Sequence, residues 1–268
     1  MIPKIVTAVT LVSALLALAT AGIMVRFSLV GSFPAWFLAV FLATETLLLL
    51  AVLERRAPVF GPIFWRGAPG HNRIALSFDD GPNEPFTSQV VEILKDKKAK
   101  ATFFVIGDNC ARFPEAVKRL ADEGFEIGNH TWTHDVLPLK PPSRIREEIE
   151  KTSELIAYIT GRRPTLFRAP HGWRNPWVNG IAREQGCTPV AWTLGVWDTD
   201  RPGAREILHR TLKGATDGCI LLLHDGRGTE HGTDSSQLVE ALPGIIDELR
   251  RRGFEFVTIP QMLDAEDR

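Results

Sequence analysis

The stretch Leu76-Ser77-Phe78-Asp79-Asp80-Gly81-Pro82 sets two adjacent carboxylates at the end of an apolar run, directly before a turn. Ile74, Leu76 and Phe78 alternate with smaller or polar residues, which is the period-2 pattern of a strand, and Gly81-Pro82 ends it. In α/β folds, catalytic groups usually stand at the carboxyl ends of strands. Two carboxylates buried together would repel, so we expect a cation beside them. Taken alone, the pair is also compatible with an ordinary solvated turn.

A second polar segment, His130-Thr131-Trp132-Thr133-His134, follows the strand-like run 125–128. Two imidazoles at i and i+4 share one face of a helix or a tight turn and are close enough to hold one ion. The alternative is one surface histidine and one hydrogen-bonded core histidine. The acidic pair at an equivalent strand end favours a metal site of two histidines and one aspartate.

Three further segments carry polar residues at strand ends. The run from Leu166 ends at Arg168 before a Pro/Gly turn, and the apolar run from Ile220 ends at His224. Between them, the segment 191–198 leads to Asp198. Five strand ends therefore present Asp, His, Arg, Asp and His, which indicates one shared active site.

These segments resemble, in order, the motifs of the polysaccharide deacetylase family, which is carbohydrate esterase family 4 and carries the NodB homology domain. Residues 77–81 match its T/S-F-D-D-G motif and residues 130–134 match H-S/T-x-x-H. Residues 168–172 match R-x-P-aromatic-G, with His171 in place of the usual aromatic residue, and residues 222–224 match L-x-H. In the fourth motif, Gly195 replaces one acidic residue and Asp198 matches the other. The resemblance covers residues 70 to 262.

The resemblance implies a metal-dependent hydrolase that removes N-acetyl or O-acetyl groups from a carbohydrate such as an N-acetylglucosamine-containing polysaccharide, peptidoglycan or a lipid-linked sugar. One divalent metal ion is expected, with zinc favoured and cobalt, nickel or manganese also compatible with the donor set. Because successive side chains of a strand diverge, the two aspartates are expected to take different roles. The implied metal ligands are Asp80, His130 and His134. The implied catalytic residues are Asp79 as base, His224 as acid, Asp198 orienting His224, and Arg168 beside Asp79. The implied substrate-binding residues are His171 (through its backbone N–H), Leu222 and Trp173. A membrane-tethered carbohydrate-binding module of the same fold, without turnover, is the alternative.

Alternating strand and helix patterns between residues 71 and 262 predict a parallel sheet. With about seven strands, and given the resemblance, the expected fold is an α/β distorted (β/α)7-type barrel. Ser143 is the expected N-cap of a long helix, with Gly161 just past its end. Helices are predicted near 86–96, 114–123, 143–159, 176–185, 204–213 and 236–252, and further strands at 101–106, 166–168, 188–192, 219–223 and 254–258.

The region ahead of the catalytic domain is strongly apolar. Residues 5–25 carry no charge and approach the length that crosses a bilayer, and a second run over 33–53 is interrupted by Glu45. We predict a transmembrane hairpin over 1–56, a linker over 57–70, the catalytic domain over 71–262 and a tail over 263–268. A cleaved signal peptide is the alternative for the first run.

Basic residues set the expected orientation. Lys4 precedes the first run and Arg55, Arg56 and Arg66 follow the second, whereas Arg26 alone lies between them. The positive-inside rule then places the catalytic domain on the cytoplasmic side, with the extracytoplasmic side as the alternative.

The amino-acid composition limits the classes of partner that the chain is expected to bind. The net charge is −1 and no basic cluster indicates nucleic-acid binding. The expected partners are an acetylated glycan or lipid-linked sugar and a membrane, and no obligate protein partner is evident. Three scattered cysteines imply buried thiols rather than a disulfide framework.

Overall fold

The computed structural model describes residues 35–56 and 58–264. The chain divides into two compact units, Met1–Val52 and Leu53–Arg268. Helix α2 (Ala35–Leu53) occupies most of the predicted second span, whereas the predicted first span, 5–25, lies outside the described residues. Among the helices of the described part, none is long and apolar enough to cross a membrane. The structure therefore does not support the predicted transmembrane hairpin.

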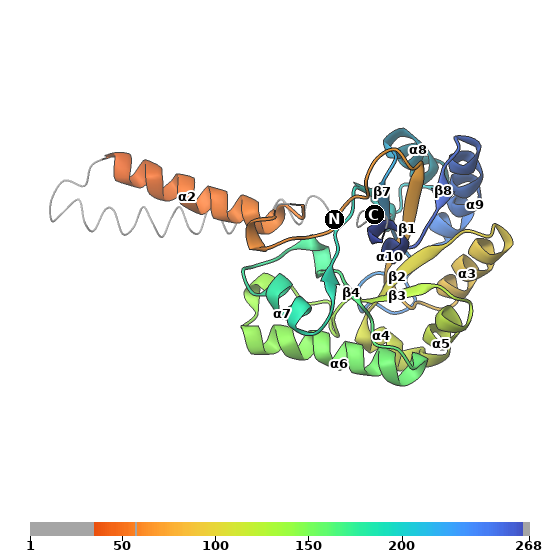
Figure 1. Cartoon of the computed structure of the whole chain (residues 1–268), viewed down its shortest axis with the longest axis horizontal. Helices are drawn as coiled ribbons and strands as arrows, with labels where there is room; N and C mark the ends of the chain where they lie inside the picture. The colour runs from red at the N-terminus through yellow and green to blue at the C-terminus, as the bar shows by residue number, and fades with distance from the viewer. Residues whose placement is uncertain (1–34, 57, 265–268) are drawn as a thin grey trace. The chain divides into compact units, whose positions relative to one another are not determined.

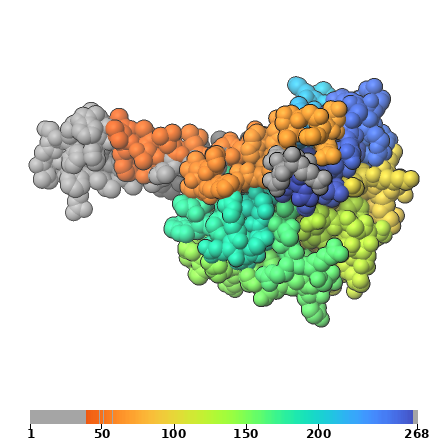
Figure 2. All heavy atoms as spheres, in the orientation of Figure 1, coloured from red at the N-terminus to blue at the C-terminus, as the bar shows by residue number. Residues whose placement is uncertain are grey.

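The second unit is built on a curled sheet whose paired strands are all parallel, as predicted (Figure 1). The strand order is β5-β4-β3-β2-β1-β7-β6, and β8 pairs with the start of β1. Ahead of β1, Phe64 bridges to Val190 beside β5, and Arg66 bridges to Cys219 at the start of β7. In Figure 2, orange atoms of the segment that precedes β1 border teal atoms of the chain. The segment links the edge strand β5 to β7, the neighbour of the other edge strand, so the predicted parallel α/β fold is confirmed as a curled half-barrel. The strands are β1 (Arg73–Gly81), β2 (Ala101–Val105), β3 (Glu126–Asn129), β4 (Leu166–Phe167), β5 (Thr188–Pro189), β6 (Leu194–Gly195), β7 (Cys219–His224) and β8 (Glu255–Phe256).

Helices alternate with the strands and surround the sheet (Figure 1). The predicted helices are present within about two residues of their expected ends, but α4, α10 and strand β6 were not predicted. Ser143 is not the N-cap of α6: the helix begins at Pro142, whose missing N–H needs no partner at the first position. Gly161 ends α6 in the left-handed conformation, as predicted. The helices are α3 (Phe86–Asp96), α4 (Gly107–Arg112), α5 (Pro114–Asp122), α6 (Pro142–Thr160), α7 (Val178–Glu184), α8 (Ala204–Gly214), α9 (Ser236–Arg251) and α10 (Ile259–Leu263), with short 3-10 turns η1 (Pro58–Phe60), η2 (Leu137–Leu139), η3 (Pro170–Gly172) and η4 (Asp198–Asp200).

The two faces of the sheet have different cores. Leu76 and Phe78 belong to the large cluster that includes buried residues of α3 and α9. Ala75, from the opposite face of β1, packs with Phe104 and Ile220 in a second cluster inside the barrel. Because alternate strand residues share a face, Ser77 and Asp79 continue the inner face above this cluster. The inner core thus ends where the polar residues begin, at the carboxyl ends of the strands. The cysteines Cys110, Cys187 and Cys219 are free and buried, as predicted.

Candidate active site

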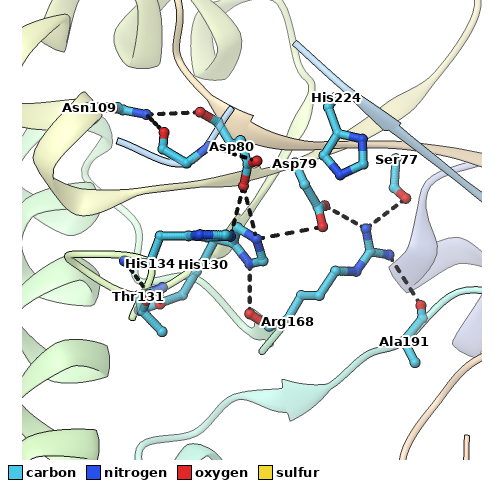
Figure 3. Close-up of polar contacts among 12 residues, drawn as sticks. Ser77, Asp79, Asp80, Asn109, His130, Thr131, His134, Arg168, Ala191 and His224 are labelled. Atoms are coloured by element: carbon cyan, nitrogen blue, oxygen red, sulfur yellow. Dashed lines mark hydrogen bonds and ion pairs between the residues drawn. The ribbon is translucent and has the colours of Figure 1, made fainter. Parts of the chain in front are cut away.

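Strand β1 ends in a bulge that brings both carboxylates to one place. Asp79 pairs with Phe104 and Gly81 with Val105, so Asp80 is the extra residue, at φ 70. The Oδ2 atom of Asp79 lies 3.6 Å, and the Oδ1 atom of Asp80 lies 3.3 Å, from Nε2 of His130 (Figure 3). The two side chains therefore do not diverge as on a regular strand, because the left-handed backbone at Asp80 turns its carboxylate back into the mouth.

The bulge is packed too closely for side chains at two glycines. A Cβ at Gly81 would lie 2.3 Å from a carboxylate oxygen of Asp225. A Cβ at Gly226 would lie 2.3 Å from the carbonyl oxygen of Asp80. The turn after β7 is thus pressed against the turn after β1, and both carry site residues.

Asp80, His130 and His134 lie together, as predicted, and form a cluster of candidate metal ligands. Each offers one donor atom, and these atoms all lie within 4.8 Å of one another. Nε2 of His134 is 3.1 Å from Oδ1 of Asp80, which is buried and accepts no hydrogen bond within the described part of the chain. Nδ1 of His130 lies 2.8 Å from the carbonyl oxygen of Arg168, which as an acceptor requires N–H there and leaves the Nε2 lone pair free. Two imidazole nitrogens and one carboxylate suit zinc or a similar divalent ion with open positions, so the residues fit a metal.

The charges of the cluster are mutually stabilising. Burial by itself would raise the pKa of Asp80, but the charge of His134 and the close approach of both imidazoles hold this pKa well below its usual value. Burial likewise acts to lower the pKa of His134, and the Asp80 carboxylate outweighs it, so this pKa is raised. The aspartate is therefore an ionised ligand near neutral pH.

The histidine segment is an irregular turn held from below by α6. Thr131 and His134 have φ values of 68 and 59, so the segment is the tight turn of the two predicted possibilities and not a helix. The buried Glu148 accepts the N–H groups of Trp132 at 2.9 Å and Thr133 at 2.8 Å through Oε2. Its Oε1 accepts the Thr133 hydroxyl at 3.0 Å. Sequence reasoning missed Glu148, although a charged residue next to Ile149 on the buried face of α6 could have indicated it.

Arg168 is the cation that the acidic pair requires. It is fully buried, and its NH1 donates to Oδ1 of Asp79 at 2.6 Å and to Oγ of Ser77 at 2.9 Å (Figure 3). Its NH2 donates to the carbonyl oxygen of Ala191 at 3.2 Å. The guanidinium therefore holds one oxygen of Asp79, while the other oxygen faces His130.

His224 and Asp198 form a second pair at the mouth. Nδ1 of His224 lies 2.9 Å from Oδ1 of Asp198, and the backbone N–H of His224 donates to Oδ2 at 2.7 Å. Burial acts to lower the pKa of His224, but the Asp198 carboxylate outweighs it and raises this pKa to about 9. His224 is therefore a cation near neutral pH, with Nε2–H left as a donor.

The three predicted substrate-binding residues lie around these groups. The ring of His171 is 4.8 Å from that of His134 and 5.0 Å from that of Trp173, and His171 has φ 59. Leu222 is buried, two residues before His224 on the same face of β7. The structure thus brings all ten predicted residues to the carboxyl ends of the strands.

The loop after β7 also contacts the site. The N–H of Gly228 donates to Oδ2 of Asp80 at 2.8 Å. Asn109 donates to the carbonyl oxygens of Asp80 at 2.8 Å and Gly228 at 3.0 Å. Asp225 is buried behind the bulge and accepts the Thr87 hydroxyl, and burial raises its pKa to about 7. No sequence pattern joins these residues, because each contact spans a long stretch of chain.

Comparisons with known proteins agree with this geometry. Residues 66–190 match the model of the family described as polysaccharide deacetylase. The chain is 36% identical over 217 residues to a peptidoglycan-N-acetylglucosamine deacetylase from Bacillus cereus, covering 79% of this chain and 98% of the relative. It is 36% identical over 200 residues to a chitooligosaccharide deacetylase from Bradyrhizobium sp., covering 72% and 91%.

A solved structure extends the likeness to three dimensions. The crystal structure of the Bc1960 peptidoglycan N-acetylglucosamine deacetylase matches with a TM-score of 0.71 and 34% identity, over 75% of this chain and 92% of that chain. Fold, site and sequence therefore agree that this chain is an enzyme of the polysaccharide deacetylase family.

Proposed function

We propose that the protein hydrolyses the acetamido group of an N-acetylglucosamine-containing glycan, releasing acetate and leaving a free amine. The observation that carries the proposal is the grouping of an arginine-held aspartate, a three-ligand cluster and an aspartate-paired histidine at one mouth. Relatives named as peptidoglycan and chitooligosaccharide deacetylases support this substrate class. Lipid-linked sugars with an acetamido group belong to the same class, and O-acetyl groups are a second candidate target.

Asp80, His130 and His134 would hold one divalent ion. Such an ion acts as a Lewis acid on a carbonyl and lowers the pKa of water, and zinc is our first choice among zinc, cobalt, nickel and manganese. The orphaned Oδ1 of Asp80 and the free Nε2 of His130 support this assignment.

Asp79 is the proposed general base. Arg168 occupies its Oδ1, which fixes the orientation of the carboxylate. Its Oδ2 faces the metal-binding imidazole of His130 and is placed to accept a proton from the attacking water. This position separates the base from Asp80, whose Oδ1 belongs to the ligand cluster.

His224 is the proposed general acid. Asp198 holds its Nδ1 and raises its pKa, so Nε2 carries a proton to the nitrogen of the amide C–N bond as that bond breaks. The carbon of the former amide leaves as acetate. The backbone N–H of His171 would stabilise the developing oxyanion, Leu222 would line the acetyl pocket and Trp173 would stack on the sugar.

The test is acetate release by the purified full-length chain from chitotetraose and from soluble peptidoglycan fragments. We expect turnover that a chelator abolishes and an added divalent ion restores. Asp79→Asn, which keeps the size of the base but not its basicity, should lower kcat by at least about a hundredfold. Absence of metal-dependent release from every acetylated glycan tested, with measurable glycan binding, would refute the hydrolytic function.

The location is a separate proposal that rests on the sequence alone. We propose that the apolar region 1–56 attaches the chain to a membrane, with the catalytic domain on the cytoplasmic face as the distribution of basic residues suggests. Membrane fractionation and a C-terminal reporter that is active on only one side of the membrane would test both points. A soluble chain, or a reporter active only outside the cytoplasm, would contradict them.

A further inference from the structure

A hollow beside His224 has no role in the chemistry described above. Its volume is about 210 Å³, and its lining contains Asp198 and His224 but none of the three proposed metal ligands. Because His224 is the proposed proton donor to the departing amine, the hollow would lie next to the sugar side of the broken bond. The remaining lining residues come from η4, the loop after β7 and the start of α9: Thr199, Arg201, Gly226, Arg227, Thr233, Asp234, Ser235, Gln237 and Leu238.

Positive charge outweighs negative charge around this hollow. Both of its carboxylates are engaged: Asp198 pairs with His224, and Asp234 pairs with Arg201. The exposed Arg227 guanidinium has no hydrogen bond or ion pair in the part of the chain that the structure describes. One positive charge therefore remains uncompensated at the wall. The N-terminus of the 16-residue helix α9 also borders the hollow, and its dipole adds positive potential there.

The backbone around Arg227 is tied to the active site. Its neighbour Gly226 packs against the carbonyl oxygen of Asp80, and its other neighbour Gly228 donates to the Asp80 carboxylate. The carbonyl oxygen of Arg227 accepts the N–H of Glu230 at 3.1 Å. The arginine is therefore presented from an anchored turn, between the metal-binding aspartate and His224.

We propose that this hollow is a subsite in which Arg227 binds an anionic substituent, a carboxylate or a phosphate, on the sugar that carries the reacting acetamido group or on its neighbour. The inference rests on the proposed deacetylation and adds a preference within it: anionic glycans are favoured over neutral ones. A guanidinium suits either anion because its planar N–H groups can pair with two oxygens at once.

The test compares three probes: chitotetraose as the neutral one, a tetrasaccharide of alternating N-acetylglucosamine and N-acetylmuramic acid for the carboxylate, and N-acetylglucosamine 1-phosphate for the phosphate. In Arg227→Gln, we expect the preference in kcat/KM for the better anionic probe over chitotetraose to fall about tenfold. High salt should shrink this difference between wild type and variant. Arg162→Gln removes an equal charge from the exposed loop before β4, at the opposite ends of the strands, and should retain the wild-type preference.

Binding separates this inference from the proposed function. Calorimetric titration of the same probes into Asp79→Asn and into Asp79→Asn/Arg227→Gln needs no turnover, so it decides the subsite even if no probe is hydrolysed. A loss of anion preference in the double variant supports the subsite, and the more affected probe identifies carboxylate or phosphate as the anion. The subsite would be overturned if removal of the Arg227 guanidinium changed the anion preference by less than twofold, both in binding and in kcat/KM. Turnover by wild type would in that case leave the proposed deacetylation standing.

Discussion

Replacement of Asp198 by Asn should move the alkaline limit of activity to lower pH. The carboxylate of Asp198 contacts both Nδ1 and the backbone N–H of His224, and it is the main influence that raises the pKa of His224 to about 9. The amide of Asn has nearly the same shape as the carboxylate but no charge. The lowering of the His224 pKa by burial is then opposed only weakly. The pKa of His224 should fall to its ordinary value of 6.5 or below.

The size of the effect depends on pH because His224 can serve as the proposed acid only while it is protonated. At pH 8, a pKa of about 9 leaves about 90% of the imidazole protonated, whereas a pKa of 6.5 leaves about 3%. The variant should therefore lose about thirtyfold in kcat at pH 8 and less than about twofold, from titration, at pH 6. General damage to the site would lower the rate equally at both values.

The assay is the pH profile of kcat for acetate release between pH 5.5 and about 10, in wild type, Asp198→Asn and Asp200→Asn. Asp200 lies on the same 3-10 turn, and its replacement by Asn removes the same charge. The Asp200→Asn variant should therefore keep the wild-type alkaline limit. An Asp198→Asn profile whose alkaline limit stays within about half a pH unit of wild type would refute the assigned pairing.

The stability of the fold should follow the same linkage. Because the pKa of His224 is raised in the folded state, its contribution to stability is complete below pH 6.5 and is lost as pH rises through about 9. Wild type should therefore lose more stability than Asp198→Asn over that window.

Three other perturbations test neighbouring contacts. Arg168→Gln leaves the buried Asp79 without its cation; we expect kcat to fall at least a hundredfold and unfolding free energy to fall by about 3 kcal/mol in urea titrations, and wild-type stability would show that the pair is not structural. Glu148→Gln weakens the acceptor that holds the histidine turn, so metal affinity measured by competition with a chelating dye should fall about tenfold, whereas Glu147→Gln on the exposed face of α6 should not change it. Metal removal should lower Tm in calorimetry, because an ion that binds only the folded chain stabilises it; an equal Tm with and without the ion would argue against an ordered site at Asp80, His130 and His134.

Much of the fold follows from local patterns. The alternation in 74–78 and the helical periodicity of 86–96 were sufficient to locate β1 and α3, because apolar period and turn residues act over a few neighbours. Helix α4 was missed because a six-residue helix is too short to show a period. The N-cap of α6 was misplaced by two positions, at Ser143 instead of Pro141, because Pro142 takes the first position of the helix.

The same distinction between local patterns and long-range contacts applies to the candidate site. The amino-acid sequence was enough to show which residue types stand at the strand ends, since motifs such as 77–81 and 130–134 are contiguous, and it therefore indicated the family and the ten candidate site residues. Three features became visible in the folded chain alone: Asp80 forms a bulge beside Asp79, Glu148 holds the histidine turn, and Arg227 lies beside His224 with no hydrogen bond or ion pair among the described residues. Each of these depends on left-handed backbone or on contacts such as Gly228 to Asp80, between residues 148 positions apart. Local periodicity cannot encode such contacts, because they form only when the ends of several strands pack together.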